Sequence, residues 1–266
     1  MADYGRVRVG GAETWVRVDG ESLTPLVAAP WIDPTPQPGA SPLDPSHVSW
    51  LPPVTPSKIL GVGRNYAQHA KEHGVEVPTS PLLFLKAPSS LLVGGESVKL
   101  PPESKQVECE GELGIVIGRR LRRFNPNGDL GDAVFAYFAA DDVTARDVQR
   151  SDGQWARGKS FDGFCPVSRL IRTEAPAPGA MLTTRFNGAV RQAAPISDMV
   201  FGIAAILEHA SAAMTLEPGD IILTGTPAGV AGLLEGDEVT IEIEGVPPLV
   251  HGVAKEEAAA AARERA

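Results

Sequence analysis

Three glutamates at alternate positions are the residues of this sequence whose types and spacing most directly suggest chemistry. Glu108, Glu110 and Glu112 lie within residues 107–118, among apolar residues and glycines. Side chains of a β-strand alternate between its two faces, so this spacing predicts three carboxylates on one face and an apolar row on the other. Like charges along one strand face repel each other and weaken a sheet unless something offsets them.

Two interpretations of this acidic face follow. It can be the solvated outer face of an antiparallel strand, which needs no ligand. It can also be a site for a hard cation, because neighbouring carboxylates on a rigid strand offer the oxygen ligands that Mg²⁺, Mn²⁺ and Ca²⁺ prefer. This segment alone leaves both interpretations open.

A second candidate site is the segment His69-Ala-Lys-Glu72-His73, which matches the H-x-x-E-H pattern of inverted zinc peptidases. In that interpretation both histidines bind zinc and Glu72 is the base. The helix predicted here, capped by Asn65 and ended by Gly74, is shorter than such a site needs. The same spacing also allows Glu72 to orient the His69 imidazole, or two exposed polar side chains without a role.

Four further polar residues could meet a ligand, although each also suits an ordinary surface position or turn: Arg64, Gln149, Lys159 and Thr226. Thr226 belongs to the segment 224–229, whose backbone N–H groups and hydroxyl could bind a carboxylate. The sequence contains no GxSxG elbow, Walker loop, HExxH or GxGxxG pattern. Several large enzyme classes are therefore disfavoured.

The elements that must position these residues are mostly strands separated by turns. The 28 glycines and 24 prolines favour a β-rich α+β fold over a helical bundle. The apolar run 134–140 predicts a buried strand that ends at Asp141 and Asp142. Asn187-Gly188 predicts a hairpin, and the apolar spacing of residues 198–214 predicts a long helix. Further strands are predicted at residues 6–9, 14–18, 58–63, 82–85, 97–100, 221–224 and 238–244.

The chain is predicted to have three parts. Residues 1–57 form a small N-terminal β unit with a proline-rich connector, residues 58–254 form the main domain, and residues 255–266 form an alanine-rich tail with a frayed surface helix.

The totals describe an ordinary globular protein. The net charge of −9, with 24 basic and 33 acidic residues, disfavours nucleic acid and anionic membrane surfaces as partners. No apolar run has membrane-spanning length, and residues 1–20 lack the apolar region of a signal peptide. The two cysteines form no CxxC pair. A cytoplasmic location is expected.

The order of these segments resembles the fumarylacetoacetate hydrolase family. The resemblance covers residues 58 to about 250, and the N-terminal unit is similar to that of bacterial members described as 2-hydroxyhepta-2,4-diene-1,7-dioate isomerases or acylpyruvate hydrolases. The segments that carry it are Gly61-Val-Gly-Arg-Asn-Tyr-Ala-Gln-His69, Glu110-Gly-Glu112-Leu, Asp142-Val-Thr-Ala-Arg-Asp147-Val-Gln149, Trp155 with Gly158-Lys-Ser-Phe-Asp162, and Thr224-Gly-Thr-Pro-Ala-Gly229.

The resemblance implies a mixed β-sandwich or roll, usually a homodimer, with a divalent metal that is commonly Mg²⁺. This sequence has Glu108-Cys109-Glu110 where Asp-Tyr-Glu is commoner, so no direct role is expected for Glu108, nor direct metal contact for Asp141. The implied metal ligands are Glu110, Glu112 and Asp142; the implied catalytic residues are His69 and Glu72, on a short lid helix, and Lys159; the implied substrate-binding residues are Arg64, Tyr66, Gln149 and Thr226.

The resulting hypothesis is a Mg²⁺-dependent enzyme, with Mn²⁺ or Ca²⁺ as alternative ions, that acts on a 2-oxo or 2,4-dioxo acid. Three carboxylates leave about three of six positions around Mg²⁺ for water or substrate, and the metal acts as a Lewis acid on an enolate. C–C hydrolysis of an acylpyruvate-type substrate, with His69 as the base for water, is placed ahead of diene-dioate isomerisation and oxaloacetate decarboxylation. The competing class is a non-catalytic metal- or carboxylate-binding β protein, which would leave His69, Glu72 and Lys159 without a role.

Overall fold

Three β-sheets form the framework of the computed structural model, which describes residues 2–72 and 74–256. The largest sheet has twelve strands, in the order β3-β2-β1-β14-β11-β10-β17-β5-β6, with β4, β7 and β13 attached to this path. Its strands are β1 (Asp3–Val9), β2 (Ala12–Asp19), β3 (Ser22–Pro25), β4 (Ser49–Leu51), β5 (Ile59–Gly63), β6 (Leu82–Lys86), β7 (Leu91–Val93), β10 (Gly111–Ile117), β11 (Val134–Asp141), β13 (Cys165–Val167), β14 (Leu170–Arg172) and β17 (Ile221–Leu223).

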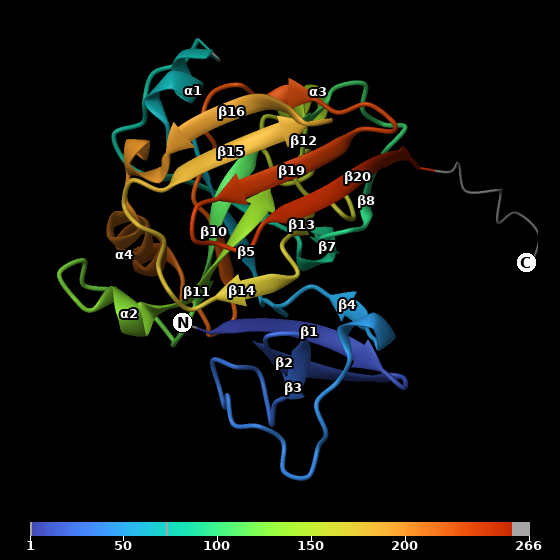
Figure 1. Cartoon of the computed structure of the whole chain (residues 1–266). Coiled ribbons are helices and arrows are strands. Elements are labelled where there is room, and N and C mark those ends of the chain that lie inside the picture. Colours follow the sequence, from blue (N-terminus) through green and yellow to red (C-terminus); the bar gives the residue numbers. More distant parts are fainter. Residues whose placement is uncertain (1, 73, 257–266) are drawn as a thin grey trace, which may run out of the picture.

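A five-stranded sheet covers one face of the central strands of the large sheet (Figure 1). It runs in the order β16 (Ala189–Pro195), β15 (Met181–Phe186), β19 (Glu238–Ile243), β20 (Leu249–Lys255) and β8 (Ser97–Leu100). A small third sheet joins β12 (Thr144–Ala145), β9 (Val107–Cys109) and β18 (Ala231–Gly232). The helices lie at the edges and are α1 (Ala67–Glu72), α2 (Leu130–Ala133), α3 (Arg146–Asp152) and α4 (Ile203–Ala213), with 3-10 turns η1 (Pro45–His47), η2 (Pro88–Ser90) and η3 (Ile196–Asp198).

The β-rich α+β fold predicted from the sequence is confirmed, as are most of its strands. The hairpin between β15 and β16 turns at Asn187 and Gly188, whose φ values of 49° and 82° are those that this turn requires. Gly74, also at positive φ, follows α1 as predicted.

Two local predictions are wrong. The long helix begins at Ile203 rather than at residue 198, because η3 and the extended Gly202 precede it. Asn65 does not use its side chain to cap α1. Its amide instead donates to the carbonyls of Phe201 and Thr224 and accepts from the Phe201 N–H, so it ties three segments together.

The segment 107–118 is not one strand, which corrects a further prediction. It breaks at Glu110 into β9 and β10, which belong to different sheets. The predicted alternation nevertheless holds on both sides of the break. Val107, Cys109, Leu113, Ile115 and Ile117 all pack in one core cluster, together with side chains of the five-stranded sheet. The opposite face of β10 contributes Val116 to a second cluster, so β10 is buried on both faces.

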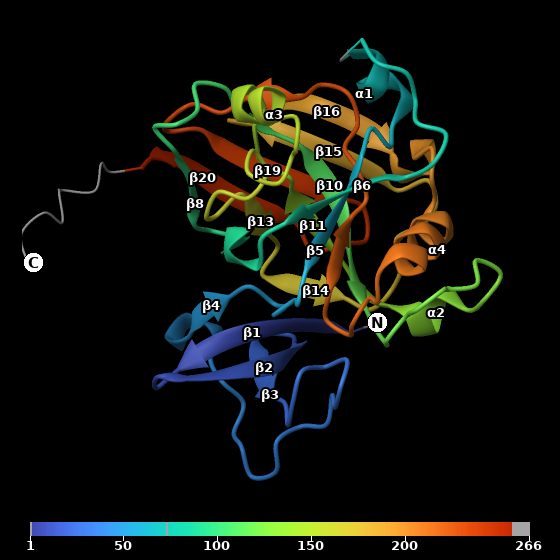
Figure 2. The ribbon, with the colours of Figure 1, turned by 180° about the vertical axis from the view of Figure 1, so that it is seen from behind.

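The N-terminal strands continue the large sheet, because β1 pairs antiparallel with β14 (Figure 2). The proline-rich segment contains η1 and β4, two short elements that the sequence did not predict. The boundary at residue 57 stays a prediction. Of the predicted tail, Lys255 ends β20 and Glu256 follows it outside any helix, and the remaining positions lie outside the described residues. Among the helices in the described part of the chain, none is both long and apolar enough to cross a membrane.

Candidate active site and metal centre

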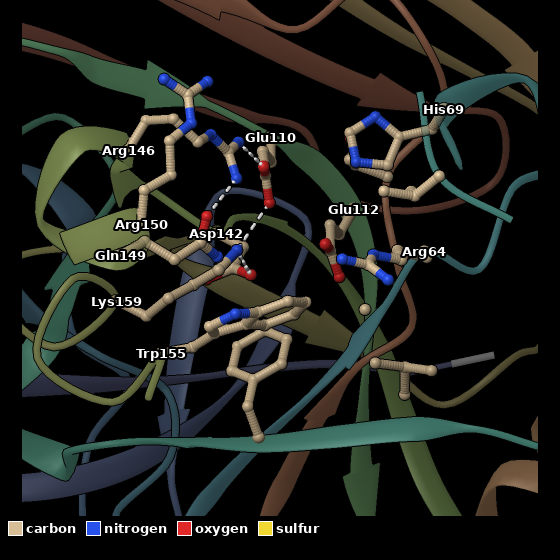
Figure 3. A pocket seen from close by; sticks show the side chains of 15 residues that line it. Arg64, His69, Glu110, Glu112, Asp142, Arg146, Gln149, Arg150, Trp155 and Lys159 are labelled. Atoms are coloured by element: carbon tan, nitrogen blue, oxygen red, sulfur yellow. Dashed lines mark hydrogen bonds and ion pairs between the residues drawn. The ribbon is translucent and has the colours of Figure 1, made fainter. Parts of the chain in front are cut away.

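A cavity of about 290 Å³ lies where the break between β9 and β10, the end of β11 and the start of α3 meet. Its lining gathers most of the residues that the sequence singled out (Figure 3). The lining residues are Val62, Gly63, Arg64, His69, Val75, Phe84, Glu110, Glu112, Asp142, Arg146, Gln149, Arg150, Trp155, Lys159 and Thr226.

The three predicted metal ligands converge at one wall of this cavity. Glu110 and Glu112 lie two positions apart at the start of β10, and Asp142 follows β11, the antiparallel neighbour of β10. The Asp142 N–H donates to the Glu110 carbonyl over 2.9 Å, which holds the two backbones together. One oxygen from each carboxylate lies within 4.8 Å of the others. The two glutamates are only 4% and 2% exposed, so the interpretation as a solvated outer face is wrong for them.

Buried cations balance two of these acids. The Lys159 ammonium donates to Glu110 over 2.7 Å and to Asp142 over 2.5 Å. Arg146 forms a further ion pair with Glu110, and Lys86 donates to Asp142 over 2.7 Å. Burial alone would raise the pKa of Glu110, but the charges of Lys159 and Arg146 outweigh it and hold that pKa well below its usual range.

Glu112 differs from its two neighbours. Its described hydrogen bond comes from the backbone N–H of Gly225, over 2.6 Å. Burial raises the pKa of Glu112 well above its usual range, and the negative charges of Asp142 and Glu110 raise it further. A divalent cation would relieve this repulsion, and three carboxylate oxygens are the hard ligands that Mg²⁺ and Mn²⁺ prefer. The residues present therefore fit such an ion.

A tight loop places the Lys159 side chain next to Glu110 and Asp142. Its Gly158 packs so closely on the backbone of Ala145 and Gln149 that a Cβ atom there would clash. The Gly158 carbonyl accepts from the Ala145 N–H over 2.8 Å. Burial lowers the pKa of Lys159, but Asp142 and Glu110 outweigh this effect, so the pKa is raised and the lysine is a cation.

His69 and Glu72 form the predicted pair on α1. The His69 Nδ1 atom lies 3.4 Å from a Glu72 carboxylate oxygen, and His69 is buried while lining the cavity. Glu72 also accepts from the Gly229 N–H over 3.2 Å, which links α1 to the turn after β17. His73, on which the zinc-peptidase alternative depends, lies outside the described residues.

Aromatic rings form a further part of the cavity wall. The Arg64 guanidinium lies 5.7 Å from the centre of the Trp155 ring, and Trp155 packs on Phe84 with ring centres 5.4 Å apart. Gly61 and Gly63 make room for these two rings, since a Cβ atom at either position would overlap them. These contacts account for both glycines. Arg64 itself has a φ of 59°, a strained value for a residue with a side chain and one that often marks functional sites.

The structure brings nearly all the predicted site residues together. Gln149 accepts from Arg146, and the Thr226 hydroxyl donates to the Gly111 carbonyl at the cavity wall. Two of them do not line the cavity: Glu72, which contacts His69, and Tyr66, which lines a different pocket with Asp198 and Pro227. The Tyr66 hydroxyl is buried, and burial, with the charges of Glu112 and Asp198, raises its pKa. The roles assigned to all these residues stay predictions.

Sequence reasoning missed several residues that line this cavity or contact its acids. Lys86 ends β6, 56 positions before its partner Asp142, and the sequence around it carries no signal for a site. Arg146 and Arg150 could have been found, because with Gln149 they occupy positions three and four apart on α3, which places them on one helix face. Glu108 contacts the site indirectly, by accepting from Arg146 over 2.7 Å.

Comparisons with known proteins agree with this geometry. A protein-family model described as "Fumarylacetoacetate (FAA) hydrolase C-terminal" matches residues 58–254. The chain is 40% identical over 220 residues to "Oxaloacetate tautomerase Fahd2a, mitochondrial" of Rattus norvegicus, covering 78% of this chain and 70% of that protein.

Two solved structures are also similar. The 2-hydroxyhepta-2,4-diene-1,7-dioate isomerase from Mycobacterium marinum superposes with a TM-score of 0.86 and 36% identity, over 97% of this chain and 100% of that one. Fumarylpyruvate hydrolase from Pseudomonas aeruginosa, solved in complex with Mn²⁺ and pyruvate, gives a TM-score of 0.70 and 27% identity, over 78% of this chain and 92% of that one.

Proposed function

We propose an activity for this chain on the premise that it belongs to the fumarylacetoacetate hydrolase family, which the match over residues 58–254 establishes. Members of this family are enzymes, and the relatives named above include a hydrolase, an isomerase and a tautomerase. Our proposal is a divalent-cation-dependent enzyme that moves a proton next to the oxo group of a 2-oxo dicarboxylic acid. Mg²⁺ or Mn²⁺ is the proposed ion.

The observation that carries this proposal is the placement of the acid triad and His69 in one cavity. When bound by Glu110, Glu112 and Asp142, a divalent cation would supply Lewis-acid polarisation of the 2-oxo group, which makes the neighbouring C–H acidic. His69 lines the same cavity and is the residue proposed to take and return that proton. Glu72 is the residue proposed to orient the imidazole, through its contact with Nδ1.

The charges around the cavity favour a substrate with two carboxylates. Arg146 and Lys159 are already paired with Glu110, whereas none of the ion pairs in the described part of the chain involves Arg64 or Arg150. A guanidinium binds a carboxylate with two parallel hydrogen bonds. These two arginines are therefore the proposed contacts for the substrate carboxylate that lies farther from the acids.

Proton transfer is our first candidate reaction because, among the relatives named above, the tautomerase and the isomerase are more similar to this chain than the hydrolase is. The tautomerase is 40% identical and the isomerase 36% identical to this chain, against 27% for the fumarylpyruvate hydrolase. C–C hydrolysis, which the sequence placed first, is the second candidate. The His69–Glu72 pair favours it, since the same oriented base could activate a water molecule. The homodimer and the cytoplasmic location stay predictions.

The test is a turnover screen with purified protein over oxaloacetate, acylpyruvates and hydroxymuconate-type dienes. Activity should disappear with EDTA and return with Mg²⁺ or Mn²⁺. Turnover that persists in EDTA, or that returns only with Zn²⁺, would contradict the proposal.

A His69→Ala variant then separates the roles within the site. It should lose roughly a hundred- to ten-thousand-fold in tautomerisation or hydrolysis, the usual contribution of a general base, and keep its Mn²⁺ affinity. It should also keep much of any oxaloacetate decarboxylation, because loss of CO₂ needs the Lewis acid but no base at His69. Gln68→Ala, an exposed neighbour on α1 that does not line the cavity, is the matched control. Equal losses in both variants would reject His69 as the base.

A further inference from the structure

A buried histidine outside the cavity contacts an aspartate directly beside a metal-ligand candidate. His251 lies in β20, in the five-stranded sheet, and its Nε2 atom is 2.9 Å from an Asp141 carboxylate oxygen. The two residues are 1% and 0% exposed. They come from different sheets and lie 110 positions apart in the chain. Nothing in the proposed activity uses either of them.

The hydrogen bonds of His251 restrict where its protons lie. Its Nδ1 atom faces the Gly252 carbonyl at 3.0 Å, and a carbonyl oxygen can only accept, so Nδ1 carries a proton. The contact between Nε2 and Asp141 then needs one more proton, on either of the two partners. In both arrangements the pair is neutral as a whole. His251 therefore offsets the charge of Asp141, which would otherwise add to the repulsion among the acids.

The second oxygen of Asp141 connects this pair to the metal-ligand candidates. It accepts from the backbone N–H of Glu110 over 2.8 Å, at the break between β9 and β10. The next residue after Asp141 is Asp142, whose N–H donates to the Glu110 carbonyl. Asp141 thus holds the backbone of Glu110 from one side while Asp142 holds it from the other. The first of these contacts depends on where the Asp141 carboxylate lies.

We propose that His251 is a positioning residue for the metal site, acting through Asp141. From the five-stranded sheet it orients the Asp141 carboxylate toward the Glu110 N–H, and so sets the position of the Glu110 and Asp142 side chains relative to Glu112. This inference rests on the proposed divalent-cation site. Hydrogen-bond partners just outside a set of metal ligands typically change metal affinity by roughly 10- to 100-fold when they are removed.

The competing explanation is that His251 only fills space in the core. Val253 lies on the same face of β20, two positions further along, and is buried in the main core cluster. A purely structural role predicts that removal of either side chain lowers stability and leaves the metal site of the folded protein unchanged. The hydrogen-bond role predicts a change in metal affinity for His251 alone.

The experiment measures binding of Mn²⁺ alone to the full chain, by titration calorimetry or by the electron paramagnetic resonance signal of free Mn²⁺. His251→Leu, which keeps the volume but removes the donor, should weaken Mn²⁺ binding by roughly 10- to 100-fold. His251→Gln places an amide N–H near the position of Nε2 and should restore affinity to within about threefold of the wild type. Val253→Ala, the matched control, should bind Mn²⁺ like the wild type despite lower thermal stability.

A double-mutant cycle tests whether His251 acts through Asp141. The losses in Mn²⁺ affinity for His251→Leu and Asp141→Ala should not add in the double variant, since both remove the same contact. Should His251→Leu fail to fold, Asp141→Asn replaces it in the test. Asparagine can still accept from the Glu110 N–H and donate to a neutral Nε2, so its Mn²⁺ affinity should stay within about threefold of the wild type.

The proposal is overturned if His251→Leu binds Mn²⁺ like the wild type, or if Val253→Ala loses as much Mn²⁺ affinity as His251→Leu does. It is also overturned if His251→Gln does not restore the affinity, or if the losses of His251→Leu and Asp141→Ala add in the double variant. Loss of Mn²⁺ binding in Asp141→Asn would overturn it as well. Failure of the wild type itself to bind Mn²⁺ or Mg²⁺ is a different result, because it would reject the proposed function as well.

Discussion

Two buried carboxylates of this protein, Asp220 and Glu112, differ in how many hydrogen-bond donors surround them. Asp220, 1% exposed between α4 and β17, accepts five hydrogen bonds. They come from the N–H and hydroxyl of Ser57, the N–H and ammonium of Lys58, and the N–H of Glu217. Glu112 is 2% exposed, and its described donor is the single N–H of Gly225.

The difference separates a structural carboxylate from one available to a ligand. The donors around Asp220, the Lys58 ammonium among them, offset its loss of hydration, so Asp220 holds the start of β5 against the start of β17 and needs no bound metal ion. Burial raises the pKa of Glu112, and the neighbouring charges of Asp142 and Glu110 raise it further. A buried carboxylate with few donors and negative neighbours is stabilised by a cation that the protein itself does not supply.

The largest effect is expected for Glu112→Gln. Glutamine keeps the shape and can accept from the Gly225 N–H, but it removes the charge. Mn²⁺ affinity should fall by more than the roughly 100-fold upper value for outer partners of metal ligands, and turnover should be lost. In EDTA the variant should unfold at the same temperature as the wild type or higher, because glutamine cannot ionise at this buried position, where an ionised carboxylate lowers stability. A variant that is strongly destabilised in EDTA would contradict the comparison.

Asp220→Ala should show the reverse pattern. It leaves the N–H groups of Ser57, Lys58 and Glu217 without their acceptor, which should cost about 3 kcal/mol of unfolding free energy. Mn²⁺ affinity of the folded variant should stay within about threefold of the wild type. Denaturant unfolding and Mn²⁺ titration of the same samples measure both quantities. Retained stability, or a metal-binding defect as large as that of Glu112→Gln, would show that the two carboxylates are not different in kind.

The pH dependence of metal binding sharpens the comparison further. Because the pKa of Glu112 is raised, this carboxyl stays protonated above the usual glutamate value of 4.5, and a metal ion must displace its proton. Mn²⁺ affinity should therefore fall about tenfold for each pH unit below the raised pKa of Glu112. The same carboxyl, in the metal-free protein, should lower stability as the pH rises through that pKa. A Mn²⁺ affinity that does not change between about pH 5 and pH 8 would be inconsistent with this account.

The smallest effect is expected at Asp147, a more exposed counterpart of Asp220. It accepts from the hydroxyl of Ser104 and the N–H groups of Lys105 and Val148. Burial has the largest single effect and raises its pKa, but these hydrogen bonds together outweigh burial and lower the pKa. A lowered pKa gives stability that is present above about pH 4 and is lost as the pH falls. Asp147→Asn should cost about 1 kcal/mol near neutral pH and progressively less below pH 4, by thermal unfolding at several pH values.

Local sequence signals predicted the elements well where neighbours along the chain decide the structure. The hairpin at Asn187-Gly188 forms because these residues tolerate positive φ, whatever lies around them. The helix start shows the limit of such signals. The apolar stripe continues through Met199 and Val200, but Met199 pairs with Tyr66 and the Val200 N–H donates to the Asn65 carbonyl, so both are held outside the helix.

The sequence by itself determined which carboxylates are candidates and that they share a face. Alternation along a strand and the apolar run before Asp142 are local properties, and both survive in the structure.

Only the tertiary structure decided that Glu110 and Glu112 are buried, and which cations and backbone groups balance them. Lys86 and His251 approach the site from 56 and 110 positions away from their partners. The Gly225 N–H that reaches Glu112 lies 113 positions along the chain. Burial and charge balance depend on distances in space, which periodicity along the chain does not encode, so these partners could not be read from the sequence.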